Sequence, residues 1–538
     1  MTLPIRVDGT TYEFNLIDTP GHVDFSYEVS RSLAACEGAI LVVDASQGIQ
    51  AQTVANVHLA TEGKLAIVPF VNKIDLPHAH PLDVMGEMEK AFAFDVEEMM
   101  LGSAKTGEGV DALFAAVVRR VPPPPGDETP LRALVFDSEY NEFRGVVTYI
   151  RLFSGRLRRG DRIRMLGARE NYEALEVGKF MPDMKPVAEL LPGEVGYVIA
   201  GIKRIQDVQI GDTVTHEEGH ETVELLPGYK EPKQFVFCSL YPAASEDYEA
   251  LRKALDRLSL NDSSFSFLPE SSPALGFGFR CGFLGLLHME IVQERLERES
   301  DLDLVQTAPT VTYEILLVSE EVVRITSPAE LPEPFKIREF REPYVRLSMI
   351  VPADSIGNIM KLAESRRGTY QSTEYLSETR VILVYEVPLA EILYDFFDKL
   401  KSLTSGYGTM DYEWLGFRPN DLVKLRILIG GDEVDALSSI VHRDKAFRKA
   451  KALLSSLKSE IPRHMFQIAL QAAIGGRVIA RENIVSMAKN VLAKCYGGDI
   501  SRKRKLLEKQ KEGKRRMKSI GRVTIPQKAF LAVLASAD

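Results

Sequence analysis

EFNLIDTPGHVDF, at residues 13–25, is the stretch that decides the fold of the first part of this 538-residue chain. Apolar and polar residues alternate over Tyr12–Ile17, which predicts a strand, and Asp8-Gly9 before it predicts the turn of a β-hairpin. Apolar runs at Ala39–Val43 and Leu65–Val71 predict strands buried in a parallel sheet, with helical patterns between them. These patterns together predict a doubly wound α/β domain.

The first candidate site is Asp18-Thr19-Pro20-Gly21-His22, directly after the first of these strands. A strand that ends in Asp18 places a carboxylate at the sheet edge where open α/β sheets bind ligands, and this carboxylate suits a magnesium-bound water. Gly21 allows its amide to approach a γ-phosphate without a Cβ clash, and His22 is suited to position an attacking water. The alternative is a turn that has this sequence by chance.

The second candidate site follows the next buried strand, at Asn72-Lys73-Ile74-Asp75. The Asp75 carboxylate can accept hydrogen bonds from N1–H and N2–H₂ of guanine, a pair of donors that adenine lacks. We expect Asn72 to meet the base and tie loops together, and the Lys73 stem to cover the face of the ring. Ser103-Ala104-Lys105 follows in the order and spacing needed to offer a backbone N–H to guanine O6. The three motifs together predict a guanine-nucleotide site.

The phosphate-binding loop of such a site, G-x-x-x-x-G-K-[ST], occurs nowhere in the 538 residues. We therefore expect a chain that begins after that loop, the first strand, the first helix and switch I of a G domain. The strands near residues 12–17 and 39–44 should then be separated or poorly paired, and GTP binding by residues 1–538 should be weak. Two hypotheses remain open: a GTPase whose written start is truncated, or a binding module that docks without hydrolysing GTP.

Proline and glycine residues mark the domain boundaries in the rest of the chain. Four consecutive prolines at Pro122–Pro125 predict a stiff linker. Many short strands broken by glycine pairs then predict a β-barrel, and two later stretches share a strand-helix-strand-strand-helix-strand layout. The predicted domains are a truncated α/β domain at residues 1–121, a β-barrel at 126–216, ferredoxin-like βαββαβ units at 230–310 and 335–418, and a basic C-terminal domain at 421–538.

Charge is distributed unevenly along the chain. The net charge is −10, but residues 421–538 alone carry about +14, so the first 420 residues carry about −24. The steepest part, residues 501–522, predicts a surface for a polyanion, and the alternative is a solvated basic tail. The four cysteines form no CxxC pair, which argues against a zinc site or a disulfide framework and fits a reducing compartment. The sequence has no apolar run long enough to span a membrane and no visible signal peptide.

The motifs in this order resemble those of the translational GTPases. Within that class, Tyr12–Asp44, Gly276–His288 and Asp499–Arg522 are similar to the LepA family, also called elongation factor 4. The family BipA/TypA shares the general layout but not the last of these stretches, so it is the alternative. The resemblance covers essentially the whole chain and implies a multidomain fold of α/β, β-barrel and α+β parts: an incomplete P-loop-type G domain, a barrel called domain II, two ferredoxin-like domains and a distinct C-terminal domain.

The resemblance also implies a function. It implies a ribosome-stimulated GTP hydrolase with GTP or GDP and Mg²⁺ as ligands, tied to translational fidelity and to back-translocation of tRNA. It implies a cytoplasmic monomer that binds the ribosome, with part of the pool on the cytoplasmic face of the membrane and without a stable protein partner. A polyanionic ribosome suits the basic residues near the C-terminus, since cations that neutralise phosphates release counterions. The residues carried over as rRNA or tRNA contacts are Arg502, Lys503, Arg504, Lys505, Lys514, Arg515, Arg516 and Lys518.

Overall fold

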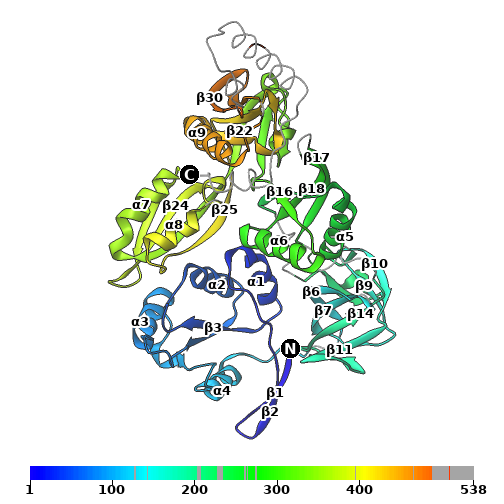
Figure 1. The fold of residues 1–538 in the computed structure, drawn as a ribbon. Helices are drawn as coiled ribbons and strands as arrows, with labels where there is room; N and C mark the ends of the chain where they lie inside the picture. Colours follow the sequence, from blue (N-terminus) through cyan, green and yellow to red (C-terminus); the bar gives the residue numbers. More distant parts are fainter. Residues whose placement is uncertain are drawn as a thin grey trace, which may run out of the picture.

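The computed structural model describes residues 1–487 and Glu508, apart from 127–128, 142, 203–206, 227–233, 260–261, 263, 273–274, 394 and 465. The chain forms several units in series (Figure 1). An α/β unit lies at the bottom left of this view, an antiparallel sheet lies at its right, and two α+β units and a C-terminal unit lie above them. The predicted multidomain architecture is therefore confirmed at this level.

The first unit has a parallel sheet of three strands in the order β3-β4-β5, which pair in register through residues such as Asp44 and Asn72. Because the polar residues that follow these strands meet at one edge, the sheet positions the second and third candidate motifs. Its elements are β3 (Gly38–Asp44), β4 (Ala66–Asn72), β5 (Met100–Leu101), α1 (Ser26–Leu33), α2 (Ala51–Glu62), α3 (Pro81–Phe92) and α4 (Val110–Arg120).

The N-terminal hairpin does not belong to this sheet. β1 (Thr2–Val7) and β2 (Thr10–Asn15) form a separate antiparallel pair around the Asp8-Gly9 turn. β2 and β3 therefore do not pair, as we expected for the strands near 12–17 and 39–44. The expectation that the strand before Asp18 lies in the α/β sheet is wrong. The hairpin packs against α4, where the ring centroids of Phe14 and Phe114 lie 5.5 Å apart, and beside β11 (Glu176–Met181) of the next unit, where the Lys179 ammonium lies 2.7 Å from the Glu13 carboxylate.

The second unit is an antiparallel sheet of eight strands in the order β10-β9-β15-β6-β7-β14-β11-β12, beside the β13-β8 pair. These strands share one apolar core. The unit is joined to the first by ion pairs: Arg31 lies 3.2 Å from Asp137, and Glu37 pairs with the buried Arg151. The remaining strands are β6 (Arg132–Asn141), β7 (Gly145–Ser154), β8 (Leu157–Arg158), β9 (Arg162–Met165), β10 (Glu170–Glu173), β12 (Asp183–Pro186), β13 (Glu189–Leu190), β14 (Val195–Ile199) and β15 (Thr213–His216).

The third and fourth units both have the element order βαββαβ, and their sheets have equivalent strand orders, β19-β16-β18-β17 and β25-β22-β24-β23. One apolar core runs through both. Two further strands, β20 and β21, extend the sheet of the fourth unit. The elements are β16 (Val236–Pro242), α5 (Tyr248–Ser259), β17 (Ser266–Ser272), β18 (Gly276–Phe283), α6 (Leu286–Ser300), β19 (Leu304–Gln306), β20 (Tyr313–Leu317), β21 (Val322–Ile325), β22 (Ile337–Pro352), α7 (Ile356–Ser365), β23 (Thr369–Tyr375), β24 (Arg380–Pro388), α8 (Phe396–Leu403) and β25 (Thr409–Asn420).

The described part of the C-terminal unit is a five-stranded antiparallel sheet with one long helix packed on it. Its residues follow no period from which we could predict these elements. They are β26 (Leu422–Ile429), β27 (Asp432–Glu433), β28 (Ser439–His442), α9 (Arg443–Glu460), β29 (Ile468–Ile474) and β30 (Arg477–Ile484).

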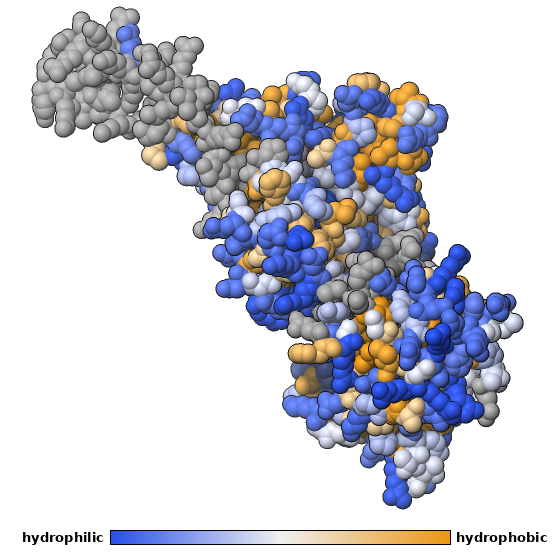
Figure 2. Space-filling view, turned by 90° about the vertical axis from the view of Figure 1, so that its right-hand side faces the viewer, coloured by the Kyte–Doolittle hydropathy of each residue, from blue (hydrophilic) through white to orange (hydrophobic). Residues whose placement is uncertain are grey.

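The face of the molecule in Figure 2 is mainly hydrophilic, and its apolar residues lie in separate patches. Exposed apolar residues of this scattered kind are normal on proteins and need no partner to explain them. Among the described residues, no helix combines the length and the apolar character needed to cross a membrane.

Candidate functional site

The loop after β4 and the loop after β5 are joined by one side chain. The carboxamide oxygen of Asn72 accepts hydrogen bonds from the backbone amide of Lys73 (2.8 Å) and from that of Ala104 (2.9 Å). The amide of Ile74 also donates to the carbonyl of Gly102 (3.4 Å). The expectation that Asn72 ties loops together is therefore confirmed, and the two motifs lie side by side.

Lys73 has a left-handed backbone conformation, with φ of 65°, and its side chain points to the end of the neighbouring strand. Its ammonium group lies 2.7 Å from the carboxylate of Asp44, whose other oxygen accepts two hydrogen bonds from Ser46. Burial acts to raise the pKa of Asp44, but the hydrogen bonds from Lys73 and Ser46 prevail and lower it. This pair fixes the start of the loop that carries Asp75.

Of the remaining residues of these two motifs, two have polar side chains that face solvent. Asp75 and Lys105 are exposed, and within the described chain neither makes a side-chain hydrogen bond or ion pair. Ser103 is buried, and its polar groups are satisfied within the loop: its amide donates to Glu108 O (2.9 Å) and its hydroxyl accepts from the Thr106 amide (3.2 Å). Since the Ala104 amide is bound to Asn72, the Lys105 amide is the one in this triplet that is left to meet a ligand.

The loop after β2 carries the first motif. Asp18 and Gly21 are exposed, and a Cβ at Gly21 would meet open space. His22 is about a third exposed, and its Nδ1 accepts a hydrogen bond from the Asp24 amide at 3.3 Å. A neutral imidazole with Nδ1 as acceptor carries its proton on Nε2, so this side chain presents a donor to the solvent side. No described contact joins this loop to Asp75.

Asp24 holds this loop against two other units. One carboxylate oxygen accepts from the amide of Leu287 (2.7 Å) at the first turn of α6 and, more weakly, from that of His288 (3.4 Å). The other oxygen accepts from the Tyr412 hydroxyl on β25, at 3.2 Å. A carboxylate at this position satisfies the unpaired amides of a helix N-terminus and interacts favourably with the helix dipole. Sequence reasoning missed Asp24, because its partners lie 263 and 388 residues away.

A second layer of polar contacts supports this junction. His288 Nε2 lies 2.7 Å from the Asp262 carboxylate, and its Nδ1 accepts from the Leu284 amide at 3.0 Å. Burial acts to raise the pKa of Asp262, but the hydrogen bond from His288 prevails and lowers it. Burial and the nearby Asp24 charge raise the pKa of the Tyr412 hydroxyl well above its usual value. The hydroxyl therefore stays protonated and donates to Asp24. The Gly276–His288 stretch runs from β18 into the first turn of α6.

The structure thus brings the second and third motifs together and holds the first on a separate loop. Among the described residues, no group of three or more His, Cys, Asp or Glu side chains is placed to hold a metal ion. The basic residues predicted as RNA contacts, from Arg502 to Lys518, lie outside the described residues.

Comparison with protein families gives one match for each of four parts of the chain. Residues 2–123 match the model of the elongation factor Tu GTP binding domain, and residues 145–215 match elongation factor Tu domain 2. Residues 339–428 match the elongation factor G C-terminus, and residues 429–535 match the GTP-binding protein LepA C-terminus.

Similar curated proteins match over nearly the full chain. Elongation factor 4 of Thermosynechococcus vestitus is 57% identical over 528 residues, which cover 98% of this chain and 87% of the relative. Elongation factor 4 of Geobacillus thermodenitrificans is 54% identical, covering 99% and 87%. Elongation factor 4 of Syntrophomonas wolfei is 56% identical, covering 99% and 90%. A crystal structure of a protein from Thermus thermophilus has a similar fold, with a TM-score of 0.51 at 19% identity over 78% of this chain and 88% of that chain.

Proposed function

Because this chain belongs to the elongation factor 4 (LepA) family of translational GTPases, we propose that it binds a guanine nucleotide between the loops after β4 and β5. The match to the LepA C-terminus favours this family over the BipA/TypA alternative. The observation that carries the proposal is the hydrogen bond from the Ala104 amide to Asn72, which holds the two loops beside each other.

Recognition of the base rests on groups that have no partner within the described protein. The Asp75 carboxylate is free to accept from N1–H and N2–H₂ of guanine, and the Lys105 amide is free to donate to O6. In this proposal the stem of Lys73, whose ammonium group pairs with Asp44, covers the face of the ring. Adenine presents the opposite donor and acceptor pattern, so it would leave Asp75 unpaired.

The phosphate side rests on the loop after β2. Asp18 is exposed and makes no hydrogen bond or ion pair in the described chain, so its oxygens are available to a water of a bound magnesium ion. This fits Mg²⁺, which uses one or two carboxylates together with waters and substrate phosphates. When bound, the ion neutralises charge on the phosphates. The open space at Gly21 leaves room for a γ-phosphate, and His22 presents Nε2–H to orient a water.

The ribosome is the proposed partner. Support comes from the family, from the positive charge of residues 421–538 and from the eight basic residues between Arg502 and Lys518 that we propose as RNA contacts. We further propose a monomer of the cytoplasm that acts in translational fidelity and in back-translocation of tRNA, with part of the pool at the cytoplasmic face of the membrane.

The base specificity can be tested with Asp75→Asn. An asparagine offers one acceptor and one donor, which suits xanthine, whose C2 carries an oxygen in place of the amino group. We expect the ratio of guanosine to xanthosine diphosphate affinity, measured by competition with a fluorescent nucleotide, to fall by about 100-fold or more. A ratio is informative even where both affinities are weak.

The matched control is Asp83→Asn, which removes an exposed carboxylate on α3, outside the three motifs. It should leave the ratio unchanged. Retention of the guanine preference in Asp75→Asn would show that these loops do not read the base.

A further inference from the structure

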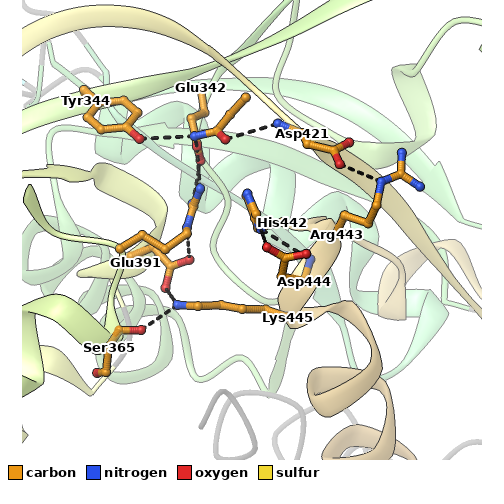
Figure 3. Close-up of polar contacts among 11 residues, drawn as sticks. Glu342, Tyr344, Ser365, Glu391, Asp421, His442, Arg443, Asp444 and Lys445 are labelled. Carbon is orange, nitrogen blue, oxygen red and sulfur yellow. Dashed lines mark hydrogen bonds and ion pairs between the residues drawn. The ribbon is translucent and has the colours of Figure 1, made fainter.

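The strand β25 of the fourth unit connects two junctions of the molecule. At its first residue, the Thr409 hydroxyl accepts a hydrogen bond from the Ala51 amide at the start of α2, at 2.9 Å. Figure 3 shows Glu342 and Tyr344 at the other junction, where the fourth and C-terminal units meet, and both accept hydrogen bonds from Asn420 Nδ2, at 2.6 and 3.1 Å. The strand is therefore held at both ends.

Tyr412 lies three residues after the first of these ends and reaches the loop after β2. Its hydroxyl donates to Asp24 Oδ1 at 3.2 Å, while Asp24 Oδ2 accepts from the Leu287 amide at 2.7 Å. A Cβ at Gly285 would overlap the Asp24 carboxylate, so the glycine leaves the space that this side chain fills. Because the Asp24 side chain is only 3% exposed, its two oxygens depend on these protein donors rather than on water.

The same carboxylate lies beside His22. Asp24 Oδ1 is 4.0 Å from His22 Nδ1, which is too far for a hydrogen bond. Nδ1 accepts instead from the Asp24 amide at 3.3 Å, and this leaves the proton of a neutral imidazole on Nε2. If Asp24 Oδ1 lost the Tyr412 hydroxyl, a buried carboxylate oxygen would be left unpaired, which is costly. A proton on His22 Nδ1 would then give that oxygen a new donor after a small rotation of either side chain.

We infer that Tyr412 is a positioning residue for GTP hydrolysis, because its hydroxyl binds Asp24 Oδ1 and so keeps the proton of His22 on Nε2. The inference rests on the proposed role of His22, which is to orient a water through Nε2–H. The hydrogen bond at one ring nitrogen decides which nitrogen carries the proton. With the proton on Nδ1, His22 would present a bare acceptor to that water in place of a donor. The fourth unit thus acts on the reaction through Asp24, without touching the nucleotide.

The tautomer of His22 can be measured by NMR on the full chain without nucleotide. Isotope-labelled histidine gives distinct chemical shifts for the two tautomers at mildly alkaline pH, where an imidazole is neutral. The His22 signal is identified by its loss in His22→Gln. We expect the Nε2–H form in the wild type and a shift of the population to the Nδ1–H form in Tyr412→Phe. The matched control is Tyr344→Phe, which removes a hydrogen-bonded hydroxyl from the same sheet at the far junction and should keep the Nε2–H form.

A double variant separates this effect from a general loss of structure. Tyr412→Phe combined with Asp24→Asn has no carboxylate beside the imidazole, and the carboxamide NH₂ can donate to His22 Nδ1. We therefore expect the Nε2–H form to return in the double variant, although it has lost more native groups than the single variant. A structural disturbance alone would not be reversed by a second substitution.

GTP turnover in the presence of ribosomes gives a second measurement. We expect the turnover number to fall by about 10-fold or more in Tyr412→Phe with an unchanged KM, because Tyr412 acts on the water-orienting group and lies outside the nucleotide loops. An unchanged His22 tautomer in Tyr412→Phe, the same change in Tyr344→Phe, or no return in the double variant would overturn the inference. Since the NMR measurement needs no nucleotide, a failure of the Asp75→Asn test would contradict the proposed base site and leave this result as it is.

Discussion

The loops on the base side and the loop on the phosphate side of the proposed nucleotide site are held in different ways. The base-side loops are held within their own unit, by Asn72 and the Ala104 amide 32 residues later. The phosphate-side loop is held by Asp24, whose carboxylate binds the start of α6 and the Tyr412 hydroxyl on β25. One part of the site is therefore fixed locally, and the other depends on how three units are packed together.

This difference determines how far the effect of a substitution extends through the molecule. A change at Asn72 should stay within the first unit, because its two hydrogen bonds do not leave it. A change at Asp24 should reach the third and fourth units, because a buried carboxylate there satisfies amides and a hydroxyl that have no replacement. The chain's one tryptophan, Trp414, reports on that junction, since it lies two residues after Tyr412 with its ring 5.2 Å from that of Phe235.

The largest expected effect comes from Asp24→Ala. Removal of the carboxylate leaves the Leu287 amide and the Tyr412 hydroxyl without their acceptor in a buried junction. We expect the free energy of unfolding, followed by Trp414 fluorescence in denaturant, to fall by about 3 kcal/mol. Hydrogen exchange should also become faster at the Leu287 and His288 amides.

Asp24→Asn sharpens this test, because it keeps one acceptor oxygen at almost the same volume. Its loss of stability should be clearly smaller than that of Asp24→Ala. An unchanged Trp414 transition in both variants would show that the carboxylate does not hold the units together.

A smaller and local effect is expected from Asn72→Ala. The amides of Lys73 and Ala104 lose their shared acceptor, which should cost about 1 kcal/mol in the unfolding of the first unit. Hydrogen exchange should become faster at Ala104 and stay unchanged at Leu287, and guanine-nucleotide affinity should fall. Faster exchange at Leu287 as well would contradict the separation between the two sides.

The smallest effect concerns pH and the pair of Asp44 and Lys73. The folded pKa of Asp44 is lowered, so its contribution to stability is present above the unfolded value of about 3.9 and is lost as the pH falls through the folded pKa. Because Lys73 is half exposed, solvent screens the pair, and we expect only a few tenths of a kcal/mol. The free energy of unfolding, measured against pH, should therefore differ slightly between wild type and Lys73→Met at acid pH. At neutral pH the two curves should have the same slope.

The sequence predicted the base-side loops well, because the ends of parallel strands meet at one sheet edge whatever the rest of the chain does. Asn72, the last residue of β4, was expected to tie two loops together, and its hydrogen bond from the Ala104 amide does so. The same reasoning failed for the strand before Asp18, which pairs only with β1 and not with the α/β sheet. Its alternation predicted the strand correctly, but alternation does not say which sheet a strand joins, because pairing depends on neighbours distant in sequence.

The family of this protein could be predicted from local properties of the chain: the order of the motifs DTPGH, NKID and SAK, the βαββαβ layouts and the uneven charge. The capping of α6 by Asp24 became visible only in the folded molecule. Local patterns record which backbone conformation a segment favours. The partners of a buried polar group are set by the packing of whole units, where the cost of an unpaired donor or carboxylate selects the contacts that remain.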